Sequence, residues 1–164
     1  KLKQQGAPTV LTAKELASLA APVLKEEGLL TDGFDPVWLE RVLALYKSRM
    51  STLRELVERA GFLFIDDFKV PEEVRTGQLI KAMPKEFAFL ADHLELAEPF
   101  DVLTTEKIFR EAVVELGIPM GEMVHPVRVA LTGDHVGPGL FDTMVVLGKT
   151  RTLARLRSAF PAGA

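Results

Sequence analysis

Cysteine is absent from the sequence of 164 residues, so a disulfide and a thiolate-ligated metal site are both excluded. A protein without disulfides suits a reducing compartment, and we expect it in the cytoplasm. No apolar stretch approaches the roughly 20 residues that a membrane-spanning helix needs. The first residues, Lys1 to Gln5, show no signal-peptide pattern. The sequence therefore predicts neither a membrane segment nor export.

Residue patterns that support catalysis are also scarce. His125 and His135 lie outside the His-Glu-x-x-His pattern of zinc enzymes, and we interpret Asp134 beside His135 as part of a loop surface. No Gly-x-Ser-x-Gly elbow is present, and no glycine-rich phosphate loop follows a strand. The glycines of Gly137-Pro138-Gly139 are most simply a tight turn before a helix. We predict no catalytic residue and no metal site in this chain.

What is present is the composition of a soluble globular protein. Hydrophobic residues make up 48% of the sequence and charged residues 26%, spread evenly along it. The formal net charge of −3 gives no overall attraction to nucleic acid. Two stretches are nevertheless locally basic, Arg41 to Arg54 and Lys149 to Arg157, and the second contains no acid. Any contact with RNA must therefore be local.

The order of helix caps and helix breakers predicts a succession of helices. Thr12 with Glu15 forms a capping-box pattern, and Asp35 precedes a proline, which is favoured at the first helical position. Three predicted helices begin after the N-caps Thr12, Asp35 and Ser51, and two more begin at Pro71 and Pro84. The next begins after Thr104 or Thr105 and ends at Gly117. The last three occupy about Met120–Leu131, Gly139–Leu147 and Lys149–Ala159. Phe62–Ile65 is short and has no alternating partner, so we interpret it as a buried connection and not a strand.

Helices joined by short polar turns predict an all-α fold made of two packed helical subdomains. We assign residues 1–75 to the first subdomain and residues 76–164 to the second, with the boundary somewhere within about 70–100, where prolines and acids gather. The sequence lacks an initiator methionine, and its polar start leads into Gly6-Ala7-Pro8, which has the composition of a linker. We expect the chain to be part of a longer protein.

One segment identifies a family. Val124–Gly133, then Gly137–Asp142, then Val145–Lys149 resemble the C-terminal signature of bacterial glutamyl-tRNA synthetases in order and spacing. The helix with Arg151, Leu153 and Arg155 fits the same family, as do Leu53–Leu56, Phe62–Phe64 and Asp67 upstream. The resemblance runs through nearly the whole chain and is weakest over residues 69–103.

This resemblance implies a tRNA anticodon-recognition domain of a glutamate–tRNA ligase, which is a class I aminoacyl-tRNA synthetase of protein biosynthesis. The whole enzyme would activate glutamate with ATP and Mg²⁺ in an N-terminal catalytic domain of the same chain. The nucleotide-binding motifs of that domain are absent here, and Lys47–Ser51 resembles one of them only superficially. We therefore expect no cofactor in these residues. The implied partners are glutamate tRNA and the catalytic domain, and we expect a monomer.

Binding of the anticodon is expected in a groove between the two subdomains, as the resemblance implies. Pro126 disfavours helical geometry at the residue before it, so His125 is expected at an irregular helix entrance where bases can meet exposed polar groups. Arg128 is either a charged fork for RNA or a salt bridge to a neighbouring helix, while Leu131 and Thr132 offer an apolar wall and a hydroxyl. The predicted tRNA-binding residues are Trp38, Arg41, Lys47, Arg49, His125, Pro126, Val127, Arg128, Leu131, Thr132, Lys149 and Arg151.

Two alternatives stay open at this stage. Glu40, next to Arg41, can occupy the position where some relatives carry an arginine that recognises the third anticodon base, and this would weaken discrimination between glutamate and glutamine tRNAs. The chain can also be a freestanding helical adaptor or an RNA-binding module without a ligase partner. A tRNA binder loses affinity steeply with salt, because basic side chains release counterions from phosphates, whereas an adaptor that buries an apolar face does not.

Overall fold

The structure, a computed structural model, describes residues 11–78 and 83–160 and is all-α over these residues, as predicted. The chain divides into two compact units, residues 1–65 and residues 66–164. The predicted linker Gly6-Ala7-Pro8 lies outside the described residues. No described helix combines the length and the apolar character that crossing a membrane requires.

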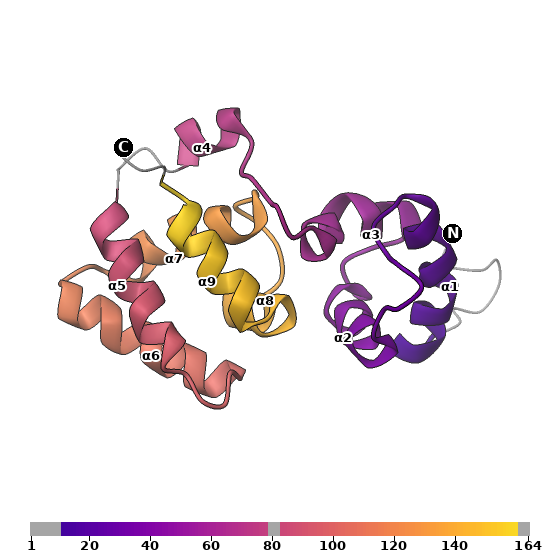
Figure 1. The fold of residues 1–164 in the computed structure, drawn as a ribbon, viewed down its shortest axis with the longest axis horizontal. Helices are drawn as coiled ribbons and strands as arrows, with labels where there is room; N and C mark the ends of the chain where they lie inside the picture. The colour runs from indigo at the N-terminus through magenta and orange to yellow at the C-terminus, as the bar shows by residue number, and fades with distance from the viewer. Residues whose placement is uncertain (1–10, 79–82, 161–164) are drawn as a thin grey trace. The chain divides into compact units, whose positions relative to one another are not determined.

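The first unit contains α1 (Ala13–Glu26), α2 (Pro36–Tyr46), α3 (Leu53–Ala60) and the short 3₁₀ helix η1 (Gly61–Phe64) (Figure 1). The capping box that the sequence predicts is present: the Glu15 N–H donates to Thr12 Oγ1 (3.1 Å), and the Thr12 N–H donates to Glu15 Oε1 (3.2 Å). The side chain of Asp35 caps α2 by accepting from the Val37 N–H (2.9 Å). The core of this unit is apolar and includes Leu16, Leu24, Leu39, Val42, Leu43, Leu56 and Leu63.

The start of α3 differs from the prediction by one residue. Thr52, not Ser51, is the N-cap, because its Oγ1 accepts from the Glu55 N–H (3.2 Å). The N–H of Ser51 instead donates to Glu55 Oε2 (2.7 Å). Phe62–Ile65 is not a strand, as predicted, but only Leu63 within it is fully buried, since the 3₁₀ turn directs its neighbours partly to the surface.

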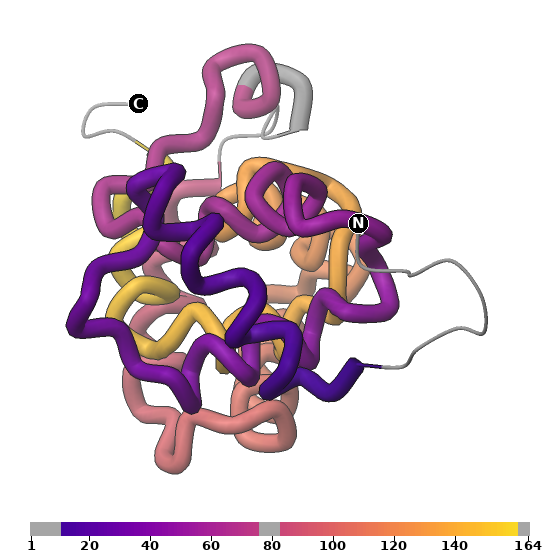
Figure 2. Tube along the Cα trace, turned by 90° about the vertical axis from the view of Figure 1, so that its right-hand side faces the viewer, coloured from indigo at the N-terminus to yellow at the C-terminus, as the bar shows by residue number. Residues whose placement is uncertain are grey.

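The second unit contains α4 (Glu72–Gln78), α5 (Pro84–Glu95), α6 (Val102–Leu116), α7 (Met120–Thr132), α8 (Leu140–Leu147) and α9 (Lys149–Ser158). Helices α5 and α6 pack together, α9 packs against α5, α7 and α8, and α4 packs against α7. Both Figure 1 and Figure 2 show α4 at the top of this unit and the turn between α5 and α6 at the bottom. Its core includes Phe87, Leu90, Leu94, Phe109, Met123, Val127, Leu131 and Met144.

The N-cap of α6 is Asp101, not Thr104 or Thr105. Asp101 Oδ1 accepts from the Thr104 N–H (2.8 Å), and this hydrogen bond lowers the pKa of the Asp101 carboxyl below its usual value. Thr105 lies inside the helix, fully buried, and its hydroxyl donates to the carbonyl of Asp101 (2.7 Å). The helix ends, as predicted, at Gly117, whose φ of 69° is the left-handed conformation that favours glycine.

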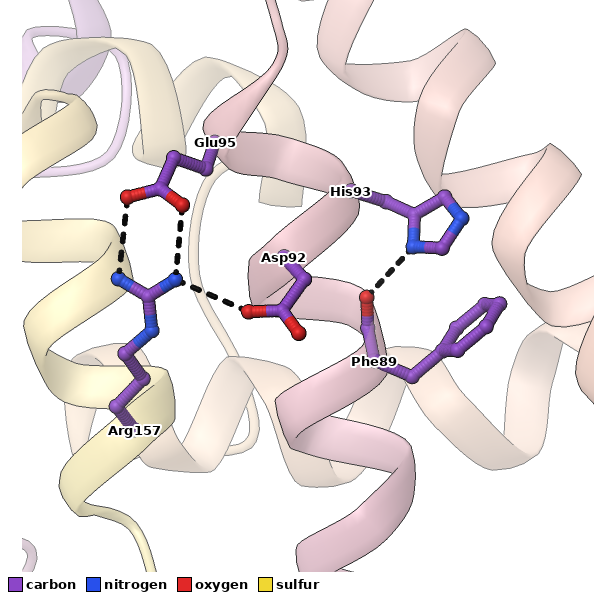
Figure 3. Close-up of polar contacts among 5 residues, drawn as sticks. All are labelled: Phe89, Asp92, His93, Glu95 and Arg157. Carbon is purple, nitrogen blue, oxygen red and sulfur yellow. Dashed lines mark hydrogen bonds and ion pairs between the residues drawn. The ribbon is translucent and has the colours of Figure 1, made fainter.

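Charged side chains fasten α9 to α5. Arg157 Nη2 lies 3.1 Å from Asp92 Oδ1 and 3.3 Å from Glu95 Oε2, as Figure 3 shows. Hydrogen bonds to Glu95 and then Asp92 raise the pKa of Arg157 above its usual value. On α5 itself, His93 Nδ1 lies 2.8 Å from the carbonyl of Phe89, to which it donates. The guanidinium of Arg157 is thus engaged with two carboxylates of a neighbouring helix.

The boundary between the compact units falls between residues 65 and 66. Helix α4 spans the end of the predicted first subdomain and packs within the second unit. The functional division into anticodon-binding subdomains of residues 1–75 and 76–164 stays a prediction.

Candidate functional site

The signature segment forms α7 from Val124 onward, much of the loop after it, most of α8 and the first residue of α9. Helix α7 runs without interruption from Met120 to Thr132 with Pro126 inside it, so His125 is helical and the predicted irregular entrance is wrong. Proline removes one backbone donor, which leaves the carbonyl of Glu122 without its usual partner four residues on. Glu122 is exposed, so water can replace that donor, and the helix tolerates the proline. His125 is exposed on this continuous helix.

Arg128 joins α7 to the loop that follows it. Its Nη1 donates to the carbonyl of Pro138 at 2.6 Å, a hydrogen bond from a charged group to the backbone. The side chain is half-buried and Pro138 is buried. A backbone carbonyl in the adjoining loop is therefore one partner of Arg128. The two alternatives from the sequence, a contact with RNA and a salt bridge to a neighbouring helix, stay predictions.

The loop between α7 and α8 is organised by its own hydrogen bonds. Thr132 Oγ1 accepts from the Asp134 N–H (3.1 Å) and lies 2.8 Å from the carbonyl of Arg128. Asp134 Oδ1 accepts from the Val136 N–H (3.2 Å), and Val136 is 63% exposed. Gly133 ends α7 with a φ of 76°, a backbone conformation that residues with a side chain rarely adopt. These hydrogen bonds fix the loop, and Arg128 contacts it through the Pro138 carbonyl.

The remaining predicted residues of the second unit differ in exposure. Val127 and Leu131 are fully buried, and Pro126 is half-buried. Lys149 Nζ donates to the carbonyl of Ala97 (3.0 Å), which fixes the first turn of α9. Arg151 Nε and Nη2 both contact Asp66 Oδ1, at 2.9 and 2.8 Å. The prediction thus includes core residues as well as surface cations.

Arg155 lies on α9, is buried, and does not belong to the predicted set of tRNA-binding residues. Its side chain is 3% exposed, its Nη1 donates to the carbonyl of Leu131 (2.6 Å), and its guanidinium lies 4.3 Å from the centre of the Phe68 ring. Burial, together with the charge of Arg151, lowers the pKa of Arg155 to about 10, against the opposite effect of Asp66. The sequence shows an arginine on a basic helix but gives no signal that it is buried.

The predicted residues of the first unit lie on and just beyond α2. Trp38 is half-buried and meets the Phe64 ring edge-on, with ring centres 5.2 Å apart and an interplanar angle of 83°. Arg41, Lys47 and Arg49 are exposed, and Lys47 Nζ lies 3.5 Å from the carbonyl of Leu11. The predicted set is therefore two groups, one in each unit. One group lies on α2 and just after it, and the other lies on α7 and the start of α9.

The residues that the structure describes contain no set of side chains that could coordinate a metal ion. No group of three or more His, Asp or Glu side chains there could hold a metal ion. Asp134 Oδ1 and His135 Nδ1 are 3.6 Å apart on an exposed loop and form only a pair. What this arrangement offers is cations, backbone groups and a helix face, which are the features that contact RNA.

Over residues 15–160 the chain matches the family described as anticodon binding domain, and it belongs to that family. Its relatives are glutamate–tRNA ligases. It is 35% identical over 152 residues to the enzyme of Thermus thermophilus, an alignment that covers 92% of this chain and 31% of the relative. It is 37% identical over 144 residues to that of Desulforudis audaxviator, covering 84% of this chain and 29% of the relative.

The fold is similar to that of solved glutamate–tRNA ligases. A crystal structure from Elizabethkingia meningosepticum aligns with a TM-score of 0.78 over 91% of this chain and 29% of that chain, at 18% sequence identity. The chain thus spans just under a third of the length of the relatives that it matches. The resemblance to glutamyl-tRNA synthetases, limited to their anticodon-binding region, is confirmed.

Proposed function

We propose that this chain recognises the anticodon loop of glutamate tRNA on behalf of an enzyme that joins glutamate to that tRNA with ATP. The observation that carries the proposal is the family match, which extends through both compact units. A freestanding adaptor would share the helices, but it has no comparable support from the relatives. On this proposal the chain supplies binding energy and identity checking, and catalysis takes place in another part of the whole protein.

The surface around α7 has the chemistry that recognition of an RNA loop requires. RNA loops are recognised when unstacked bases meet side chains and backbone groups along their exposed edges. The side chains of His125 and Arg128 and the backbone of the loop after Gly133 are the proposed contacts. Val127 and Leu131 are buried, so their proposed role is to support this surface from the core. Thr132 contributes by holding the loop through its hydroxyl.

The basic residues supply a second kind of contact. Arg41, Lys47 and Arg49 in the first unit, with Lys149 and Arg151 in the second, are proposed to approach tRNA phosphates. Such contacts orient the RNA and carry no base information. Trp38 is the proposed aromatic neighbour of the first group. The whole chain carries a net charge of −3, so this attraction comes from the local cations alone. It weakens with salt, because ions screen exposed charges and compete for the phosphates.

The properties of the whole protein form part of the proposal. Its catalytic domain would bind ATP with Mg²⁺, and the described residues here offer no donor set for that metal ion. We propose a monomer in the cytoplasm, with tRNA and the catalytic domain of the same chain as partners.

A binding titration tests the anticodon assignment. The chain is titrated with glutamate tRNA and with the same tRNA carrying an altered anticodon, each at low and at moderate salt. Recognition of the anticodon predicts tighter binding of the unaltered tRNA at both salt concentrations. Equal binding of the two tRNAs would contradict anticodon recognition by this chain, and salt-independent binding would favour an adaptor.

A further inference from the structure

A groove in the second unit lies outside the set of predicted tRNA-binding residues. It has a volume of about 600 Å³ and is bounded by residues 67–70, by α4, and by the last turns of α9. This volume lies within the range of roughly 300–1,000 Å³ that is common for ligand pockets. Ala130 forms the α7 side of the groove. Since Ala130 and Arg128 are two residues apart on a helix, their side chains point about 200° apart, and the groove lies away from the Arg128 side of α7.

The lining of the groove is basic on a chain that is acidic overall. Four cations line it, Lys69, Arg75, Arg155 and Arg157, against two carboxylates, Asp67 and Glu72. The formal excess is two positive charges, whereas the whole chain carries −3. Opposite charges also hold two of these cations in place. Arg75 pairs with Glu72 (3.1 Å), Arg157 pairs with α5, and Arg155 is only 3% exposed, so Lys69 is the exposed cation on which the positive side of the groove depends.

The floor of the groove is rigid. Phe68 lies against the guanidinium of Arg155 and against Gly133, where an added Cβ would be 3.1 Å from the ring. Arg155 is held by the carbonyl of Leu131, and its lowered pKa, about 10, shows that burial disfavours its charge. An anion near this guanidinium would offset that cost. Ser158 adds a hydroxyl to the rim, and Phe160 adds an aromatic ring that is fixed edge-on against Phe87.

Cations, a hydroxyl and aromatic rings around one groove fit a phosphodiester with its attached nucleoside. We infer that the groove between residues 67–70, α4 and α9 binds the sugar-phosphate backbone of RNA, outside the surface proposed for the anticodon bases. This inference rests on the proposed function, since membership of the anticodon binding domain family favours RNA over other polyanions. An acidic peptide would meet the same cations, but it would make little use of the aromatic rings.

The test replaces Lys69, an exposed side chain in the groove, and measures tRNA affinity against salt concentration. Loss of one phosphate contact reduces the slope of log K against log salt by about 0.7–0.9. Lys69→Ala is expected to show this reduction with glutamate tRNA and with its anticodon-altered form alike, because backbone contacts carry no base information. Lys69→Arg keeps the charge and is expected to keep the slope.

Lys107→Ala is the matched control. Lys107 is equally a surface lysine of the second unit, 75% exposed, but it lies on α6 and does not line the groove. An unchanged slope in Lys69→Ala, or an equal loss in Lys107→Ala, would overturn the inference. So would a polyglutamate peptide that competes as well as single-stranded RNA of equal charge, because the groove would then accept acidic chains.

The result separates this inference from the proposed function. Anticodon discrimination by the wild-type chain with no effect of Lys69→Ala overturns the groove alone. Equal binding of both tRNAs, with a reduced slope in Lys69→Ala only, overturns anticodon recognition and supports the groove. If the wild-type chain binds neither tRNA, both are overturned.

Discussion

Replacing Arg128 by alanine should lower the stability of the second unit as well as its affinity for tRNA. The hydrogen bond from Arg128 Nη1 to the Pro138 carbonyl, 2.6 Å long, is lost in this variant. Hydrogen bonds to charged groups contribute roughly 1.5–3 kcal/mol, and a half-buried site lets water replace part of that. We therefore expect the free energy of unfolding to fall by about 1–2 kcal/mol.

The assay is denaturant and thermal unfolding followed by circular dichroism. In a domain of about 60–100 residues, each kcal/mol shifts the midpoint temperature by roughly 4–8 °C. Arg128→Lys should retain part of the stability, because the ammonium keeps a donor and a charge but loses the planar fork. The tRNA titration is then performed well below the midpoint of each variant, so that unfolding does not contribute.

Two results would refute parts of this reasoning. If Arg128→Ala unfolds at the wild-type midpoint, the bond to Pro138 does not stabilise the loop. If stability falls while the folded variant binds tRNA as tightly as wild type, Arg128 is purely structural and its proposed role in RNA recognition is wrong.

Three further predictions concern the fold. Thr52→Ala should lower the free energy of unfolding by about 1 kcal/mol through loss of the α3 cap, whereas Ser51→Ala should change it little; equal effects in chemical denaturation would argue against the cap as observed. Leu131→Ala should cost about 2–5 kcal/mol, because the side chain is fully buried, and Leu103→Ala, at a position 81% exposed, should stay within about 0.5 kcal/mol. The pKa of Asp101 is lower in the folded chain than its unfolded value of 3.8, so the stability that this cap contributes is complete above pH 3.8 and is lost as the pH falls through the folded pKa. Asp101→Asn should therefore make the loss of stability in acid less steep, and an unchanged loss in acid would contradict this.

Local chemistry made most helices predictable. Thr12 with Glu15, Asp35 before Pro36, and Gly117 act through neighbours a few residues away, so the sequence alone contains the information. The errors arose where two capping residues compete. Ser51 and Thr52 are both suitable caps chemically, but Thr52 lies three residues before Glu55, which is the capping-box spacing, so the sequence does contain a signal for Thr52. The carboxylate of Asp101 likewise prevailed over two threonines as the cap of α6.

The candidate site was less predictable because exposure depends on tertiary packing. Periodicity cannot separate a buried Val127 from an exposed His125, since both lie in the same short motif. The geometry of Pro126 was predicted wrongly, because a statistical preference before proline is weaker than the packing of the whole helix. Arg155 was missed for a related reason: its partners, Leu131 and Phe68, are distant in sequence.

That distance has a consequence for the order in which the protein is made. Asp66, the first residue of the second unit, contacts Arg151, which is synthesised 85 residues later. Phe68 likewise packs against Arg155, which is synthesised much later in the same unit. As the polypeptide leaves the ribosome, the opening segment of this unit therefore has no α9 to pack against until nearly all of the unit has emerged. The first unit, whose helices α1, α2 and α3 pack on one another, meets no such delay during translation.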